Sequence, residues 1–287
     1  MSVARWAAEP WLDLQLELGE GPVWDYRSQE LLFLDIHAGE LYAADQAGRT
    51  TVRGLGQMIG AVGLRGESGY VLGTSGGFGL LDAGSARPRA FSDLELPEGV
   101  RMNDCQVGPD GAFWGGSMHR ISEPGRGGAY RLAPDGTVTT FIDTVTTSNG
   151  VGWSPDDRMM YYTDSATHAI DAFDFDPEAG TATNRRPLID VPEGLPDGLC
   201  VDAEGSIWVA VFHAGAVHRY APNGDLTGVV TVPANLVTSC CFGGPDLGTL
   251  YITSASAGIT FWERHAQHAG AVFAVDVGVS GRPAFVF

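Results

Sequence analysis

Residues 103–111, NDCQVGPDG, form the clearest copy of a unit that recurs along the chain. The unit begins with a polar or small residue, which we call its anchor, and an acidic turn residue follows seven positions later. Five copies begin at Gly60, Asn103, Asn149, Asp197 and Ser239. A sixth begins at Glu20 but lacks the acidic residue. The anchors recur roughly every 40 to 48 residues, which is the spacing of β-propeller blades.

The residues between the anchors support the same architecture. Short β-rich runs such as ELLFLDI, GAFWGGS and SIWVAVF alternate with turn residues, and long helical periodicity is missing. We expect an all-β protein, with residues 1–287 folded as a single six-bladed β-propeller of four-stranded blades around a central channel. The strands of the first blade are expected at 21–25, 30–36, 40–45 and 51–55. The run WLDLQLEL (11–18) is expected to pair with the C-terminal strands and close the ring.

Composition narrows the class of function. The 287 residues carry a net charge of −18, which disfavours nucleic acid and membrane surfaces as partners. All 17 basic residues are Arg, so Schiff-base and P-loop lysine chemistry is excluded. No long apolar run is present, and the four cysteines lack C-x-x-C spacing. We expect a soluble cytoplasmic protein with reduced, mostly buried thiols.

The anchors themselves indicate a site. The first strand of each propeller blade lines the channel, so the six anchors should lie at one height. They comprise two carboxylates, two carboxamides, one hydroxyl and one glycine, whereas a purely structural position would favour one residue type. Oxygen donors of this kind suit a divalent cation such as Ca²⁺, Mg²⁺ or Mn²⁺, with Zn²⁺ also possible.

The same segments resemble the senescence marker protein/regucalcin and gluconolactonase family of lactone hydrolases. The similar blocks occur in the family's order and are LGEGPVW, RMNDCQVGPDG, SNGVGWSPD, AFDFDPEAGTATNRR, LPDGLCVDAEGSIWVA and TSCCFGGPDLGTLYIT. The resemblance implies that Glu20, Asn149 and Asp197 hold one divalent metal, and that Asp197 is also the general base. It further implies that Arg101 and Asn103 contact a polyhydroxylated substrate.

One position departs from the family pattern. Animal members carry a substrate-binding Glu three residues after the Met of a G-T-M motif, whereas here Gly116-Ser117-Met118 is followed by Ile121 at that position. An isoleucine cannot make the same hydrogen bond. His119, Arg120 and Glu123 are candidates to replace it.

We therefore expect a metal-dependent hydrolase that opens sugar lactones, such as D-glucono-1,5-lactone, to aldonic acids. Xylono- or arabinonolactone is an alternative substrate, and a broader esterase or phosphotriesterase activity also fits. The metal is left open among Ca²⁺, Zn²⁺, Mn²⁺, Mg²⁺ and Fe²⁺. An alternative from another class is a non-catalytic, Ca²⁺-binding regulatory propeller.

Overall fold

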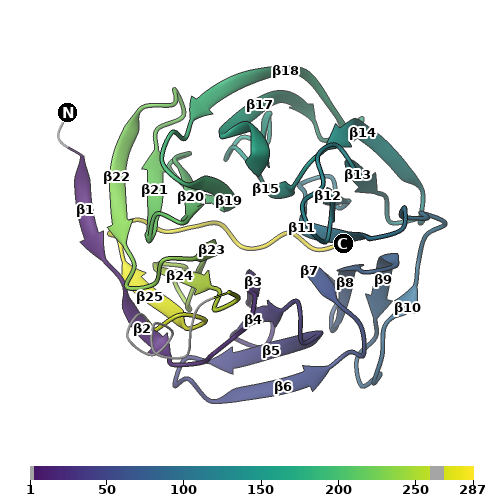
Figure 1. Ribbon diagram of the computed structural model, residues 1–287, viewed down its shortest axis with the longest axis horizontal. Coiled ribbons are helices and arrows are strands. Elements are labelled where there is room, and N and C mark those ends of the chain that lie inside the picture. Colours follow the sequence, from purple (N-terminus) through teal and green to yellow (C-terminus); the bar gives the residue numbers. More distant parts are fainter. Residues whose placement is uncertain (1–2, 259–267) are drawn as a thin grey trace.

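The computed structural model describes residues 3–258 and 268–287, whose strands form six sheets arranged around a central axis (Figure 1). This confirms the predicted six-bladed β-propeller. Among the described residues, helical structure is limited to the short 3₁₀ turn η1 (Ser165–Thr167). None of the helices described there is long and apolar enough to cross a membrane.

Five of the blades are formed by consecutive strands, with the innermost strand first. Blade 1 contains β3 (Gly19–Asp25), β4 (Glu30–Asp35), β5 (Glu40–Asp45) and β6 (Thr50–Gly54), close to the predicted ranges. Blade 2 contains β7 (Ile59–Arg65), β8 (Gly69–Thr74), β9 (Gly77–Leu81) and β10 (Arg89–Ala90), and blade 3 contains β11 (Val100–Val107), β12 (Phe113–His119), β13 (Gly127–Leu132) and β14 (Val138–Val145). Blade 4 contains β15 (Ser148–Trp153), β16 (Met159–Asp164), β17 (Ala169–Asp176) and β18 (Thr181–Asp190), and blade 5 contains β19 (Leu195–Val201), β20 (Ile207–Phe212), β21 (Ala216–Tyr220) and β22 (Leu226–Thr231).

The two ends of the chain complete the sixth blade. Its strands are β23 (Val237–Gly243), β24 (Thr249–Ser254), β25 (Val272–Asp276) and the N-terminal β2 (Glu9–Leu12), which pairs antiparallel with β25. The predicted closure is confirmed, although the strand begins earlier than the run at 11–18 and ends at Leu12. An additional strand, β1 (Ala4–Ala7), lies parallel to β22 at the edge of blade 5 and was not predicted.

The C-terminal segment, residues 277–287, crosses the ring toward its centre (Figure 1). The Phe287 backbone N–H donates to the Leu64 carbonyl (2.9 Å), and the Gly281 N–H donates to the Leu247 carbonyl (2.9 Å). The Arg282 guanidinium donates to the Ser154 carbonyl (3.0 Å). These acceptors lie where the inner strands of three blades end. The segment therefore covers that end of the channel, and the anchors lie toward the opposite end, where the inner strands begin.

All four cysteines are free thiols, as predicted. Cys105, Cys240 and Cys241 are buried, and Cys200 is partly buried. The Sγ atoms of Cys200 and Cys240 lie 3.7 Å apart, in the inner strands of neighbouring blades. This separation is a thiol contact and far exceeds the length of a disulfide bond.

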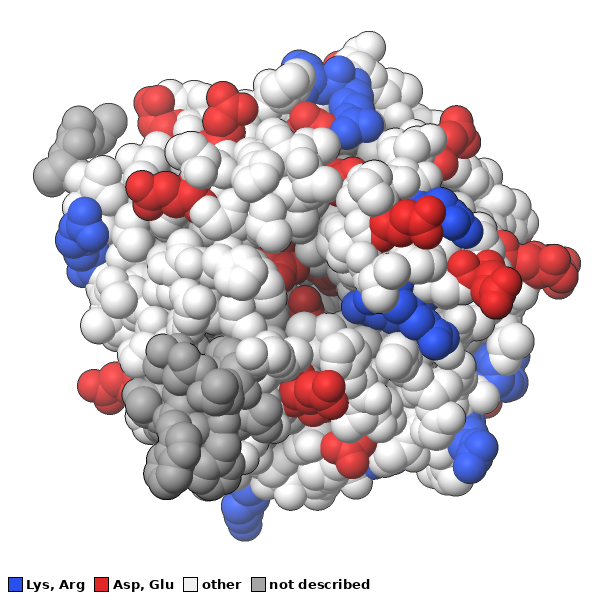
Figure 2. Space-filling view, in the orientation of Figure 1, with Lys and Arg blue, Asp and Glu red and all other residues white. Residues whose placement is uncertain are grey.

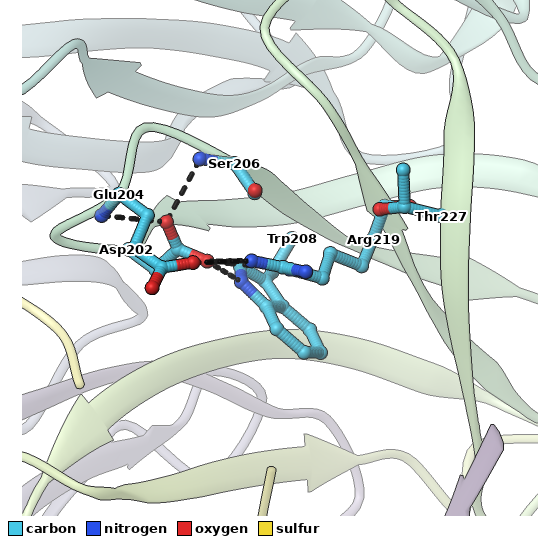
Figure 3. A network of polar contacts seen from close by, with 6 residues as sticks. All are labelled: Asp202, Glu204, Ser206, Trp208, Arg219 and Thr227. Carbon is cyan, nitrogen blue, oxygen red and sulfur yellow. Dashed lines mark hydrogen bonds and ion pairs between the residues drawn. The ribbon is translucent and has the colours of Figure 1, made fainter. Parts of the chain in front are cut away.

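A buried carboxylate at the turn after β19 links the first three strands of blade 5 (Figure 3). Asp202 Oδ2 accepts hydrogen bonds from Trp208 Nε1 (2.9 Å) and Arg219 Nη2 (3.1 Å). Its Oδ1 accepts from the backbone N–H groups of Glu204 (3.0 Å) and Ser206 (2.8 Å). The Arg219 guanidinium also lies over the Trp208 ring, 5.4 Å from its centroid. The acidic residue singled out by the repeat, Glu204, is instead exposed at its side chain.

Blade 3 contains an equivalent cluster with its carboxylate at the repeat position. Asp110 accepts from Trp114 Nε1 (3.0 Å) and from Arg131 Nε (2.8 Å), and Arg131 lies over the Trp114 ring. The same Asp–Trp–Arg arrangement is thus assembled from two different turn positions. The two blades share the contacts of the aspartate with a tryptophan and an arginine. They do not share the position of that aspartate in the turn.

We expect Asp202→Ala to lower the free energy of unfolding by about 3 kcal/mol, because it leaves the buried Trp208 indole N–H without its acceptor and leaves the Arg219 guanidinium only its contact with the exposed Glu204. Glu204→Ala removes an exposed carboxylate from the same turn and should cost less than about 1 kcal/mol. Urea denaturation followed by circular dichroism measures both. Equal losses for the two variants would contradict a structural role for Asp202.

Candidate metal and substrate site

A β-bulge interrupts every inner strand at its anchor. The pairing register with the second strand shifts between Glu20 and Val23, Ile59 and Ala61, Met102 and Cys105, Ser148 and Val151, Pro196 and Leu199, and Val237 and Ser239. A bulge leaves backbone groups out of the ladder and re-aims the local side chains. The repeat seen in the sequence therefore marks a repeated backbone irregularity at one end of the channel.

Glycines allow the inner strands to approach one another closely. A Cβ atom at Gly60 would lie 2.3 Å from the Met102 carbonyl oxygen, and one at Gly150 would lie 2.8 Å from the Asp197 carbonyl oxygen. Neither position has room for a side chain. The glycine anchor thus has a packing explanation, and the other anchors are brought together around a narrow axis.

A chain of hydrogen bonds fixes the two carboxamides. Arg101 Nη1 donates to Asn103 Oδ1 (2.5 Å), and Asn103 Nδ2 donates to Asn149 Oδ1 (2.8 Å). Asn149 Nδ2 donates to Ser165 Oγ (2.7 Å), which donates to the Pro196 carbonyl (2.6 Å). These contacts set the orientation of the Asn149 amide and present its oxygen as an acceptor. They also link blades 3, 4 and 5.

Three buried carboxylates share the same region. Glu20 is 5% exposed, Asp104 is 5% exposed and Asp197 is 7% exposed. Burial, followed by the charges of Glu20 and Asp104, raises the pKa of Asp197, and burial with the charge of Asp104 raises the pKa of Glu20. The space-filling view shows acidic side chains inside a hollow at the centre of this face (Figure 2). Carboxylates in such proximity repel one another unless a proton or a cation lies between them.

The donors fit a hard divalent cation. Asp197 Oδ1 and Asp104 Oδ2 are buried oxygens without a hydrogen-bond partner in the described part of the chain. In the described residues, no group of three or more His, Cys, Asp or Glu side chains is placed to hold a metal ion on its own. A ligand set that combines two carboxylates with a carboxamide, as predicted for Glu20, Asn149 and Asp197, is compatible with that finding. Their sharing of one ion stays a prediction.

Arg101 lies within the site and not on the surface. It is 4% exposed, and its Nη1 also donates to the Met102 carbonyl (3.0 Å). Burial lowers its pKa to about 10, while the charges of Glu20 and Asp197 oppose that shift. Arg101 therefore remains cationic at neutral pH and offsets part of the carboxylate charge.

Two residues of this candidate site, Asp104 and Ser165, were not predicted from the sequence. Asp104 follows an anchor directly, a position that regular strand alternation would turn away from the channel, and the bulge in β11 removes that alternation. Ser165 belongs to η1, outside the repeat unit, so the spacing of the anchors gave no signal for it. It reaches Asn149 because η1 follows the second strand of the same blade.

The end of β12 and the loop that follows it carry the three candidates for the missing glutamate. Glu123 forms an ion pair with Arg126 (3.1 Å), and its Oε2 lies 3.8 Å from His119 Nε2. His119 packs against Gly99, since a Cβ there would lie 2.3 Å from its Nε2. Arg120 is exposed, and its backbone N–H donates to the Gly99 carbonyl (2.9 Å). Ile121 is 81% exposed.

Comparison with known proteins agrees with the resemblance seen in the sequence. Residues 18–256 match the SMP-30/Gluconolactonase/LRE-like region. Regucalcin from Xenopus laevis is 36% identical over 278 residues, which cover 92% of this chain and 93% of that protein. The crystal structure of a calcium-binding protein, regucalcin, from Agrobacterium tumefaciens has a TM-score of 0.94 at 30% identity, covering 100% of this chain and 99% of the other.

A gluconolactonase from Xanthomonas campestris shares the fold, with a TM-score of 0.75 at 24% identity over 93% of this chain and 88% of its own. At that identity the likeness concerns architecture alone. The match over most of the sequence and the identity to regucalcin decide the assignment. The chain belongs to the SMP-30/gluconolactonase/LRE-like family.

Proposed function

We propose that the protein is a metal-dependent lactonase that opens sugar lactones such as D-glucono-1,5-lactone to aldonic acids. The observation that carries the proposal is that Glu20, Asp104 and Asp197 are all buried and close enough for their charges to raise the pKa of Asp197, while hydrogen bonds fix the amide of the neighbouring anchor Asn149. Family membership supports the same chemistry. Xylono- and arabinonolactone are further candidates, since their ring carbonyl is chemically equivalent.

The chain's own residues account for most of the chemistry. A divalent cation held by Glu20, Asn149 and Asp197 would supply Lewis-acid stabilisation of the charge that develops on the lactone carbonyl oxygen. Asp197 accepts the proton of the attacking water, because its Oδ1 has no competing hydrogen bond from the described residues. The ring C–O bond then breaks, and the leaving alkoxide takes up a proton to become the hydroxyl of the acid. No covalent enzyme intermediate is needed.

Arg101 and Asn103 bind and orient the sugar in this proposal. Arg101 has further N–H groups beyond the one that contacts Asn103, and these can donate to sugar hydroxyls or to the product carboxylate. Asn103 also holds Asn149 through its Nδ2, so in addition to contacting the sugar it positions the metal-binding oxygen. Substrate binding and metal binding are thereby coupled through one hydrogen bond.

A calcium-binding regulatory propeller is the second candidate. It is favoured by the likeness to the regucalcin from Agrobacterium tumefaciens, which is described as a calcium-binding protein. The same oxygen donors suit calcium. The two functions differ in whether lactone hydrolysis exceeds the spontaneous rate.

The lactonase should release protons from D-glucono-1,5-lactone faster than the uncatalysed reaction does. Prior treatment with EDTA should abolish the excess rate, and Ca²⁺, Mg²⁺, Mn²⁺, Zn²⁺ or Fe²⁺ should restore it to different extents. A pH-indicator assay measures this directly. Calcium binding by calorimetry, with no acceleration for any metal or lactone, would favour the regulatory propeller.

We expect Asp197→Asn to reduce kcat by about 10²-fold or more, because the amide neither accepts the water's proton nor supplies a full ligand charge. Its size is preserved, so far-ultraviolet circular dichroism should not change. Asp143→Asn, on an exposed carboxylate of β14, serves as the matched control. Retention of full turnover in Asp197→Asn would remove this residue from the mechanism.

Asp104→Asn should weaken divalent-cation binding by about tenfold, since it deletes one negative charge close to the proposed ligands. Isothermal titration calorimetry with Ca²⁺ and Mn²⁺ gives the affinity without reference to catalysis. The variant keeps the shape of the side chain, and thermal unfolding of the metal-free protein shows whether folding is preserved. An unchanged divalent-cation affinity in a folded variant would show that the charge of Asp104 does not contribute to metal binding.

A further inference from the structure

The geometry of blade 3 places a second arginine beside Arg101. Arg101 pairs with Met118 across the β11–β12 ladder, and the Arg120 N–H continues the pairing to Gly99. Met118 and Arg120 are two residues apart, so Arg120 and Arg101 are diagonal neighbours on one face of the blade. Diagonal neighbours lie within reach of long side chains. In agreement, the positive charge of Arg120 lowers the pKa of Arg101 beyond the main effect of burial.

Arg120 has no side-chain hydrogen bond or ion pair within the described part of the chain, although the protein carries a net charge of −18. The nearest acid on its own loop, Glu123, is already held by Arg126 (3.1 Å). The next residue, Ile121, contributes no charge and is exposed. Among the described residues, the rim of the site therefore presents a cation with no carboxylate paired to it.

The charge balance of the site also favours an anionic partner for Arg120. A divalent cation together with Arg101 balances the three channel carboxylates, so the charge of Arg120 is left over. A lactone with only hydroxyl groups does not compensate it. A substrate with an anionic group at the end remote from the lactone carbonyl would compensate the charge of Arg120. Arginine is also the side chain best shaped to bind a carboxylate or phosphate.

We propose that Arg120 selects sugar lactones that carry a second anionic group, a carboxylate or a phosphate, remote from the reacting carbonyl. This inference rests on the proposed lactonase function and specifies its substrate class. Arg120 binds the remote anion, and Arg101 lies between that anion and the reacting end. An anion held in this way fixes both ends of the sugar relative to Asp197.

Binding of hydrolysis products tests the anion subsite independently of turnover. At saturating Mn²⁺, calorimetry should show that glucarate, with two carboxylates, binds about tenfold more tightly than gluconate, with one. Arg120→Gln should remove this preference, Arg120→Lys should retain most of it, and Arg126→Gln, on the same loop but paired with Glu123, should leave it intact. Circular dichroism verifies that each variant is folded.

Turnover then identifies the anion. The ratio of kcat/KM for D-glucaro-1,4-lactone, or for 6-phospho-D-glucono-1,5-lactone, to that for D-glucono-1,5-lactone should exceed one and should fall about tenfold in Arg120→Gln. Whichever anionic lactone shows the larger fall assigns the subsite to carboxylate or phosphate. The preference should also weaken as salt is raised in the wild type.

The outcomes separate the two levels of the proposal. If glucarate binds through Arg120 but no lactone is hydrolysed, the anion subsite stands and the lactonase function is wrong. If lactones are hydrolysed but Arg120→Gln changes neutral and anionic ligands by the same factor, the subsite is overturned and the lactonase function stands.

Discussion

Pairing of β2 with β25 is the contact on which the remaining structure depends. It joins the two ends of the chain in one blade and leaves the ring without a seam. Blade 6 then meets blade 1, where Thr238 Oγ1 donates to the Gly19 carbonyl (2.6 Å), next to Glu20. Glu20 comes from the first blade and Asp197 from the fifth, so the two carboxylates share a channel only when the ring is closed. Closure and assembly of the site are therefore one event.

The closed ring creates an electrostatic cost at its centre. Burial raises the pKa of Glu20 and of Asp104, and each additional charge increases the repulsion. Such groups are stable as anions only with a compensating cation or with Arg101 close by. The clusters around Asp110 and Asp202, at the turns after two inner strands, are different, since each pairs its carboxylate with an arginine and an indole. The carboxylates that stabilise the blades are paired with arginines. The carboxylates in the channel lack such pairing and are available to a ligand.

The architecture could be predicted from sequence because it repeats. The spacing of the anchors depends on the length of four short strands and their turns, and the strands of blade 1 agree closely with their predicted ranges. Strand β1 could not be predicted in the same way, since it pairs with the edge of blade 5 and nothing local specifies that contact. Strand β2 begins at Glu9, two residues before the predicted run. Its Pro10 is tolerated because β2 is the edge strand of blade 6.

Apart from Arg101, which the family resemblance supplied, the candidate site was predictable only where it follows the repeat. Glu20, Asn149 and Asp197 occupy anchors, and all three are buried at the same end of their blades. Asp104 depends on a bulge, which reverses the alternation on which a sequence pattern relies, and Ser165 depends on a loop outside the unit. In blade 5 the acidic position of the repeat is occupied by Glu204, whose side chain is exposed. The buried contact with Trp208 is made by Asp202 instead. The residue type at an anchor indicates which side chains face the channel. The β-bulges decide which adjacent residues, such as Asp104, face it as well.

The residues around the channel axis (the ring) and those in the surface loops at its mouth (the rim) are under different structural constraints. This difference affects substrate specificity. Ring residues are held by contacts between blades, as in the path from Arg101 through Asn103 and Asn149, so a change at one of them disturbs several others. Rim residues belong to loops at the surface, and Arg120 and Ile121 are both exposed. In the proposed lactonase, the anchor residues polarise a carbonyl that every lactone shares, so they discriminate weakly among lactones. Discrimination must then come from groups that touch the remote end of the sugar, and a charged rim side chain without a partner among the described residues is suited to do so at little cost to the fold.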